Sequence, residues 1–312
     1  MTKINSTKII VIIGPTASGK SSLGIFLARK LRGEIISADS RQVYHGMDIG
    51  TGKVTKKEQR IARHHLLDVA NPKKIFTVSD FKKLGQKAII NIVGRKKLPF
   101  VVGGTGFYID ALVYNLNFPQ VPPNKPLRLN LNKLTSEKLF YKLKKLDPQR
   151  AKIIDRHNKR RLIRALEIID SIGKVPDLNT KYEIHNTKYD VLWLGLNPNK
   201  EKLIKKIKKR LDERLKQGMV KEVKNLHKQG VSWKRLDDFG LEYRQISRWL
   251  KSSKLKQKQS FSNSQEYENL LRDIIKYSKR QMTWFKRNKD IHWVKSEREA
   301  EKITKKFIFP LP

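Results

Sequence analysis

The sequence predicts an α/β fold, a doubly wound parallel sheet flanked by helices and interrupted by an α-helical insertion. Three observations predict it. Short apolar runs alternate with helix-like segments up to residue 112. A Pro-rich break, NFPQVPPNKP at 117–126, is then followed by basic helical segments. Finally, a strand-like run at 189–196 indicates that the chain rejoins the sheet.

The first part of the sheet is expected from three apolar runs. KIIVII at 8–13 is continuously apolar, as a strand buried on both faces should be. EIISAD at 34–39 and LPFVVGG at 98–104 give the next strands. Apolar residues recur at helical spacing over 20–31 and 77–94, between these strands. A parallel sheet built this way binds its ligand at the carboxyl ends of the strands.

The rest of the chain is predicted to be mainly helical. The expected elements are helices over 136–146 and 158–174, a strand over 189–196, helix over 199–230 broken at Gly218, a polar linker over 252–265, a helix to about Lys286 and an edge strand over 291–294. We therefore expect three segments, namely a first part of the α/β core at 1–116, a helical insertion domain at 117–187, and a return to the core with a basic helical C-terminal part at 188–312.

The charge indicates an anionic partner. Formal net charge is +40, from 69 Lys and Arg against 29 Asp and Glu. Nucleic acid is the usual partner of such a chain. An anionic membrane is less favoured because no basic amphipathic segment stands apart. A compositional bias toward Lys, Ile and Asn is the alternative explanation for part of this charge.

Several protein classes are excluded by composition. The chain has no cysteine, which removes disulfides, thiolate zinc sites and cysteine nucleophiles. No apolar run approaches the ~20 residues of a membrane helix. The start, MTKINSTK, has no apolar signal core. We expect a soluble cytoplasmic protein without a membrane partner.

Residues 14–21, GPTASGKS, match the phosphate-binding pattern G-x-x-x-x-G-K-[ST] between a predicted strand and a predicted helix. The sheet is therefore expected to be P-loop NTPase-like. Backbone N–H groups and the helix N-terminus would hold phosphates, Lys20 would add a charge, and the Ser21 hydroxyl could bind Mg²⁺. The predicted diphosphate-binding residues are Gly14, Pro15, Thr16, Ala17, Ser18, Gly19, Lys20 and Ser21.

ATP is the default ligand of such a loop, but an ATPase needs an acidic residue at the end of a buried strand. The strand FVV ends in Gly103-Gly104-Thr105-Gly106, without a carboxylate. Asp39, after EIISA, is the only carboxylate in such a position. Its two interpretations are a general base or metal ligand for a second substrate and, alternatively, a cap of the following turn.

Together these residues resemble the tRNA dimethylallyltransferase family, in its bacterial form. The matching stretches are GPTASGKS (14–21), ADSRQVYHGMDIGTGK (38–53), HHLLDV (64–69), VVGGTGFYIDAL (101–112), LDPQRAKII (146–154), RLIRALEI (161–168) and KRQMTWFKR (279–287). They keep the family's order over nearly the whole chain. Two departures are Lys286, where the family commonly has arginine, and GTGK at 50–53 in place of GTAK.

The resemblance implies an activity and the residues that carry it. The family transfers a dimethylallyl group from dimethylallyl diphosphate to N6 of adenosine 37, which lies 3′ of the anticodon in tRNA, and releases pyrophosphate. By similarity Asp39 is the base that takes the N6 proton, and Thr105 hydrogen-bonds in the reaction centre. Arg210 and Lys20 bind the leaving pyrophosphate, with Mg²⁺ as the cofactor.

The resemblance also implies a tRNA surface, which includes the insertion domain. The implied tRNA-binding residues are Asp39, Ser40, Arg41, Gln42, Thr105, Arg128, Arg160, Arg161, Leu162, Ile163, Arg164, Lys279, Arg280, Gln281, Trp284 and Lys286. Trp284 could instead belong to the core. His64-His65 could suggest a metal, but adjacent side chains point apart, so we expect packing or hydrogen bonds.

Three other functions stay open at this stage. A P-loop small-molecule kinase would hold ATP and would not need an RNA-sized basic surface. An adenylate isopentenyltransferase would share the Asp39-type base but act on free nucleotides. A non-catalytic RNA-binding protein would have no reason to keep Lys20, Asp39 and Arg210. We further expect a monomer, because RNA supplies the counter-charge and no exposed apolar stripe demands a protein partner.

Overall fold

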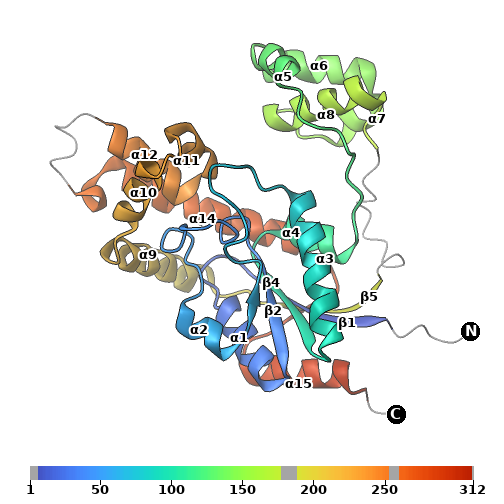
Figure 1. Ribbon diagram of the computed structural model, residues 1–312, viewed down its shortest axis with the longest axis vertical. Coiled ribbons are helices and arrows are strands. Elements are labelled where there is room, and N and C mark those ends of the chain that lie inside the picture. Colours follow the sequence, from blue (N-terminus) through green and yellow to red (C-terminus); the bar gives the residue numbers. More distant parts are fainter. Residues whose placement is uncertain (1–5, 177–187, 253–259, 311–312) are drawn as a thin grey trace, which may run out of the picture. The chain divides into compact units, whose positions relative to one another are not determined.

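The computed structural model describes residues 6–176, 188–252 and 260–310, and its centre is a parallel sheet (Figure 1). Six strands pair in the order β3-β2-β4-β1-β5-β6, and every pairing is parallel. The strands are β1 (Thr7–Ile13), β2 (Gly33–Ala38), β3 (His64–His65), β4 (Leu98–Gly103), β5 (Tyr189–Gly195) and β6 (Ile291–Trp293). The predicted α/β class with a parallel sheet is confirmed, including the return strand and the edge strand.

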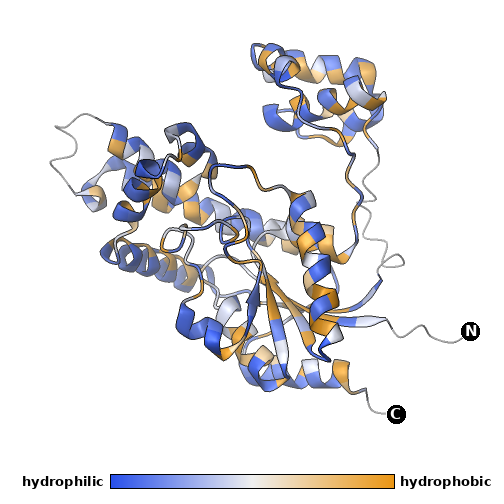
Figure 2. Ribbon diagram, viewed as in Figure 1, coloured by the Kyte–Doolittle hydropathy of each residue, from blue (hydrophilic) through white to orange (hydrophobic). Residues whose placement is uncertain are grey.

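Helices cover both faces of the sheet, so the sheet is doubly wound as predicted. On one face α1 (Lys20–Lys30) and α15 (Glu297–Ile308) pack against Ile10 and Ile12 of β1. On the other face α3 (Val78–Gly94) and α4 (Gly106–Val113) pack against Ile9 and Val11. The central strands are mainly apolar, whereas the helices alternate apolar and polar positions (Figure 2). Each face therefore buries its own hydrophobic layer.

A third apolar cluster joins the loops after β2 to the C-terminal helices. It contains Val43 and Met47 from those loops, together with Leu211, Tyr243 and Ile274 from the helices. The short helix α2 (Lys56–Ile61) precedes β3 in the sequence. The helices of the C-terminal region are α9 (Lys200–Lys216), α10 (Met219–Lys228), α11 (Trp233–Phe239), α12 (Leu241–Lys251) and α14 (Gln265–Phe285). These helices stand at the carboxyl edge of the sheet, where the predicted ligand loops lie.

The described helices of the insertion form a compact unit of their own, Leu116–Glu183, apart from the rest of the chain. The unit contains α5 (Lys125–Asn132), α6 (Ser136–Leu146), α7 (Pro148–Ile153) and α8 (Lys159–Ile172). Its core includes Leu139, Leu143, Leu162 and Leu166. The unit overlaps the segment 117–187 that the sequence set apart as an insertion.

The elements that the sequence analysis did not foresee are β3, α2, α5, α7, α11, α12 and α15. The predicted linker at 252–265 lies partly outside the described residues; of its described part, Phe261–Asn263 form a short 3₁₀ turn and α14 begins at Gln265. No helix in the three described ranges is long and apolar enough to cross a bilayer.

A buried ion network ties β2 to β3 and to the turn before β4. The Glu34 carboxylate, 1% exposed, accepts hydrogen bonds from Arg95 (2.9 and 2.7 Å), Lys97 (2.9 Å) and His65 (2.7 Å). Burial alone would raise the pKa of Glu34, but these donors outweigh it and lower the pKa to about 2. His64 Nδ1 lies 2.8 Å from the Ala62 carbonyl oxygen. Both histidines therefore make hydrogen bonds, as expected.

Candidate active site

The phosphate loop lies where the sequence placed it, between β1 and α1. Gly19 precedes the helix with a φ of 96°, a conformation that glycine adopts without strain, and α1 begins at Lys20. Lys20 Nζ donates to the Pro15 carbonyl at 3.3 Å. Burial lowers the pKa of Lys20 to about 8, the Asp39 carboxylate opposes this effect, and Arg210 adds to it. A buried lysine facing an arginine favours an anionic ligand.

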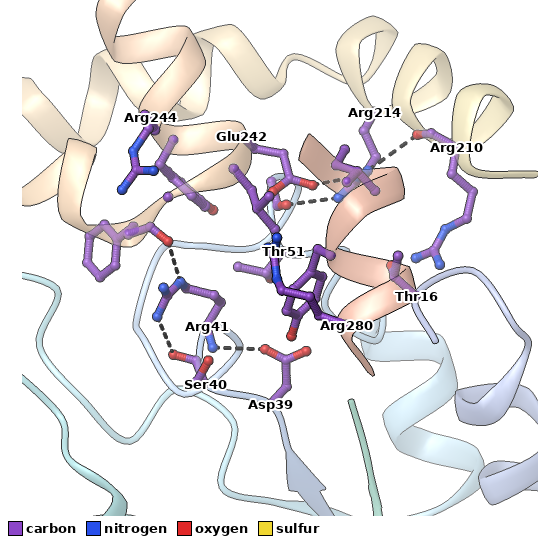
Figure 3. Close-up of a pocket in the computed structure, with 17 residues that line it drawn as sticks. Thr16, Asp39, Ser40, Arg41, Thr51, Arg210, Arg214, Glu242, Arg244 and Arg280 are labelled. Carbon is purple, nitrogen blue, oxygen red and sulfur yellow. Dashed lines mark hydrogen bonds and ion pairs between the residues drawn. The ribbon is translucent and has the colours of Figure 1, made fainter. Parts of the chain in front are cut away.

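Two cavities meet beside the loop. The larger, about 290 Å³, is lined by residues that include Asp39, Arg41, Arg244, Tyr277 and Arg280 (Figure 3). The smaller, about 60 Å³, is lined by Lys20, Ser21 and apolar side chains of β2 and β4, among others. Four residues line both cavities: Thr16, Asp39, Thr51 and Arg210. The cavities therefore adjoin each other at Asp39.

Asp39 makes the capping contacts of one interpretation and leaves the other, a base or metal ligand, as a prediction. Its Oδ1 accepts hydrogen bonds from the backbone N–H groups of Arg41 (2.8 Å) and Gln42 (3.3 Å), so it caps the turn after β2. Its Oδ2 makes no hydrogen bond to any described residue. The carboxylate borders the larger cavity (Figure 3) and also the smaller one. One oxygen holds the carboxylate in place and the other can accept a proton from a ligand.

Thr105 lies directly behind this carboxylate. Its N–H donates to Ala38 O at 3.1 Å, and its Oγ1 accepts from the Ser40 N–H at 3.1 Å. The Tyr277 hydroxyl is hydrogen-bonded to the Thr105 side chain, and burial together with the Asp39 charge raises the pKa of Tyr277 to about 12. The phenol therefore stays protonated at neutral pH. Thr105 orients the turn that carries Asp39.

Arg210 is available to a ligand, whereas its neighbour Arg214 is not. Arg214, one turn later on α9, donates to Gly50 O (2.8 Å) and to Glu242 (2.9 Å). The Arg210 guanidinium has no hydrogen bond or ion pair among the described residues, and it borders both cavities. A Cβ on Gly52 would lie 2.8 Å from Arg210 Nη2, so the glycine of GTGK leaves room for this side chain.

The comparisons with known proteins agree with this geometry. Residues 42–288 match the family model described as IPP transferase. The chain belongs to the IPP transferase family. A tRNA dimethylallyltransferase from Alkaliphilus oremlandii is 40% identical to this IPP transferase over 291 residues, with 92% of this chain and 90% of the relative covered.

Solved structures of relatives have the same fold. The tRNA delta(2)-isopentenylpyrophosphate transferase of Staphylococcus epidermidis is 35% identical, with a TM-score of 0.68, over 97% of this chain and 99% of the other. A eukaryotic dimethylallyltransferase acting on tRNA is 27% identical, with a TM-score of 0.82, over 98% of this chain and 81% of the other.

Several residues that the resemblance implied as RNA contacts make hydrogen bonds within the protein instead. Gln281, only 5% exposed, accepts from the Thr16 N–H (2.9 Å) and donates to Gly104 O (2.9 Å). Trp284 donates to Asp110 at 3.0 Å and packs so closely on Gly106 that a Cβ there would lie 2.2 Å from the ring. These two side chains clamp the phosphate loop and α4. The burial of Gln281 corrects its expected RNA contact to a structural role, whereas the RNA contact of the partly exposed Trp284 stays a prediction.

The insertion unit requires a similar correction. Leu162 and Ile163 are buried in its core, so their side chains cannot reach RNA. Arg128 and Arg164 both pair with the buried Glu167, at 2.7 and 2.6 Å, and thereby hold α5 and α8 together. Arg160 and Arg161 are exposed, as are Lys279, Arg280 and Lys286 on α14. These five, and the partly exposed Arg128 and Arg164, keep the expected RNA role as a prediction.

The sequence analysis did not predict one wall of the larger cavity, which is formed by Phe239, Gly240, Leu241, Glu242, Tyr243 and Arg244. The end of α11 and the start of α12 bring these residues to Asp39 and Arg41, and the Arg41 Nε donates to Phe239 O at 2.7 Å. The segment reads DFGLEYR, in which a glycine between two helix patterns was the only signal.

The sequence predicted one side-chain ligand for Mg²⁺, the Ser21 hydroxyl. Among the described residues, no group of three or more His, Cys, Asp and Glu could hold a metal. The Ser21 hydroxyl lines the smaller cavity next to Lys20. A single hydroxyl fits Mg²⁺, which in phosphate sites commonly binds one or two protein oxygens, substrate phosphates and water.

Proposed function

We propose that this IPP transferase is a tRNA dimethylallyltransferase, which moves the dimethylallyl group of dimethylallyl diphosphate to N6 of adenosine 37. The observation that carries the proposal is the position of Asp39, with one oxygen fixed by backbone N–H groups and the other free at the junction of two cavities. The relatives' names, tRNA dimethylallyltransferase, support the same activity.

The donor belongs beside the phosphate loop. Its diphosphate lies on the backbone N–H groups of the loop, with Lys20 and Arg210 as counter-charges. As the C1–O bond breaks, the bond electrons stay with the leaving pyrophosphate, and these cations stabilise the growing negative charge. Ser21 would help to hold Mg²⁺, which would supply further positive charge.

The acceptor adenine belongs in the larger cavity, with its N6 toward Asp39. The N6 lone pair forms the new bond to C1 of the dimethylallyl group, and the N6 proton passes to Asp39 Oδ2. The amine is a poor nucleophile because its lone pair is delocalised into the ring, which makes an adjacent proton acceptor necessary. A base in an anticodon loop must be splayed out to enter such a cavity.

The charges around the larger cavity favour RNA over a free nucleotide. Arg41, Arg244 and Arg280 line it, and Lys279 and Lys286 are exposed on the same helix as Arg280. One nucleotide carries too little charge to need so many cations, whereas successive RNA phosphates use them for position and affinity. The protein works as a monomer in this proposal, and a stable dimer in a sedimentation run would contradict that part.

The test is a transfer assay with radiolabelled dimethylallyl diphosphate and Mg²⁺. Unmodified tRNA with adenosine 3′ of the anticodon, AMP and ATP serve as alternative acceptors, and Asp39→Ala is the matched variant. Label should enter only the tRNA and should be lost in the variant. Label in AMP or ATP would establish a free-nucleotide prenyltransferase instead, and ATP turnover without transfer would establish a kinase.

A further inference from the structure

The loop at Met47–Lys53, called the 47–53 loop below, forms a wall common to both cavities. Gly50 and Thr51 line the larger cavity, and Thr51 and Gly52 line the smaller one. No substrate chemistry has been assigned to this loop, which carries no group able to exchange a proton with either substrate at the reacting atoms. Gly52 and Lys53 extend the loop to the side of Lys20, Ser21 and Arg210, where the donor diphosphate is proposed to lie.

One carboxylate from α10 holds this loop. Glu222 Oε2 accepts from the N–H groups of Asp48 (2.9 Å) and Ile49 (2.6 Å), and its Oε1 accepts from the Gly50 N–H (3.0 Å). The Tyr243 hydroxyl also donates to Oε1, at 2.7 Å. Three successive backbone N–H groups around one anion form a nest, an arrangement that usually binds phosphate or another external anion. Here the protein supplies the anion itself.

The other contacts of the loop with described residues, which include Gly52 N–H to Ile49 O (3.0 Å) and Lys53 N–H to Asp48 O (2.9 Å), offer no second acceptor for the three N–H groups that Glu222 binds. The Gly50 carbonyl is taken by Arg214 at 2.8 Å, and Lys53 donates to Tyr44 O (2.9 Å) and to Asp48 (2.6 Å). These bonds use the loop's carbonyls and side chains. They provide no acceptor for the three N–H groups at positions 48–50. Loss of the Glu222 carboxylate would leave all three without a partner, which favours a different loop conformation.

A moved loop would affect the donor first. Arg210 reaches the cavities across Gly52, where even a Cβ would come within 2.8 Å of its Nη2. The next residue, Lys53, borders the outer side of the phosphate loop together with Lys20 and Ser21. A displacement of about 1 Å at such a position is enough to lower a rate about 100-fold. RNA affinity, in contrast, depends on exposed cations elsewhere.

We propose that Glu222 is a positioning residue for the prenyl donor, fixing the 47–53 loop so that Arg210 and the phosphate loop receive the diphosphate. The inference rests on the proposed function, since it takes dimethylallyl diphosphate as the donor. Glu222 touches neither substrate and acts through the three N–H groups that it binds.

The test compares Glu222→Gln, Glu222→Ala and Tyr243→Phe. Gln keeps one acceptor oxygen but turns an NH₂ group toward a donor, so the Michaelis constant for dimethylallyl diphosphate should rise about tenfold, as for one lost charge-assisted hydrogen bond. Ala should raise it about 100-fold, and Phe only a few-fold because three of the four bonds remain. The dissociation constant of the two Glu222 variants for tRNA should stay within twofold. Glu201→Gln, at an exposed acid in the first turn of α9, controls for the change in charge.

Acetate or formate added to Glu222→Ala distinguishes positioning from folding, because a small carboxylate can refill the nest and should restore donor affinity. The proposal is wrong if tRNA and donor affinity fall together with the melting temperature, or if Glu222→Gln behaves as the wild type. Failure of the proposed function is distinguishable, since the wild-type protein would then transfer no label to tRNA at all.

Discussion

Gln281 offers the sharpest test of the corrected site, because a clamp and an RNA contact predict different losses. Its side chain joins the phosphate loop to the loop after β4, through Thr16 N–H and Gly104 O, each at 2.9 Å. Gln281→Leu keeps a similar side-chain volume and removes both hydrogen bonds, so the Thr16 N–H and the Gly104 carbonyl lose their partner. Each buried group left unsatisfied costs about 1–3 kcal/mol, so the variant should lose about 2–4 kcal/mol, taking the lower part of the sum because Thr16 is only half-buried.

That loss is a large fraction of the ~5–15 kcal/mol that stabilises a typical native protein. It should lower the melting temperature by about 5–10 °C, which differential scanning calorimetry resolves. Thr283→Ala, at an exposed position of the same helix, should leave the melting temperature nearly unchanged. The tRNA affinity of folded Gln281→Leu should equal that of the wild type. An unchanged melting temperature combined with a tenfold loss of tRNA affinity would refute the clamp and restore the RNA contact.

Three further predictions follow from buried charges. Burial lowers the pKa of Lys20 to about 8, so the free enzyme loses this positive charge as the pH rises through that value. The Michaelis constant for the donor should therefore rise about tenfold per pH unit above pH 8. Lys20→Arg should flatten this pH profile. Glu34 has its pKa lowered from 4.5 to about 2, so its contribution to stability is present above pH 4.5 and is lost as the pH falls toward 2; acid unfolding of Glu34→Gln should lack this component. Glu167→Gln should cost the insertion unit about 1–3 kcal/mol, seen as faster hydrogen exchange within 116–176 but not in the sheet.

The sheet could be predicted because its strands are buried on both faces. Short, continuously apolar runs such as KIIVII indicate strands that are covered on both faces. The glycine-rich turns after them mark the carboxyl edge of the sheet. β3 could not be found in this way, because two histidines carry no apolar period and pair with β2 only in the folded chain. α15 was missed although its apolar residues Ala300, Ile303 and Phe307 recur at helical spacing.

The site was predictable where a motif fixes a local conformation. The phosphate loop and Asp39 each depend on a turn of a few residues, which the sequence specifies. The roles of Gln281 and Glu222 depend on partners 265 and 172–174 positions away, and no local pattern encodes such distances. Leu162 and Ile163 were assigned to RNA wrongly because the resemblance applies to the whole segment. In the folded helix, one face of that segment is buried and only the other face is exposed.

The all-parallel sheet has a practical consequence when it is combined with the absence of cysteine. Every strand ends at the edge that carries the phosphate loop, so every strand begins at the opposite edge. Lys289 is exposed in the turn that precedes β6, at that opposite edge. Lys289→Cys would create the only thiol in the chain, and a dye attached there would lie away from both cavities. The fold thus provides a single labelling point from which single-molecule fluorescence can follow RNA arrival and departure with the catalytic edge unmodified.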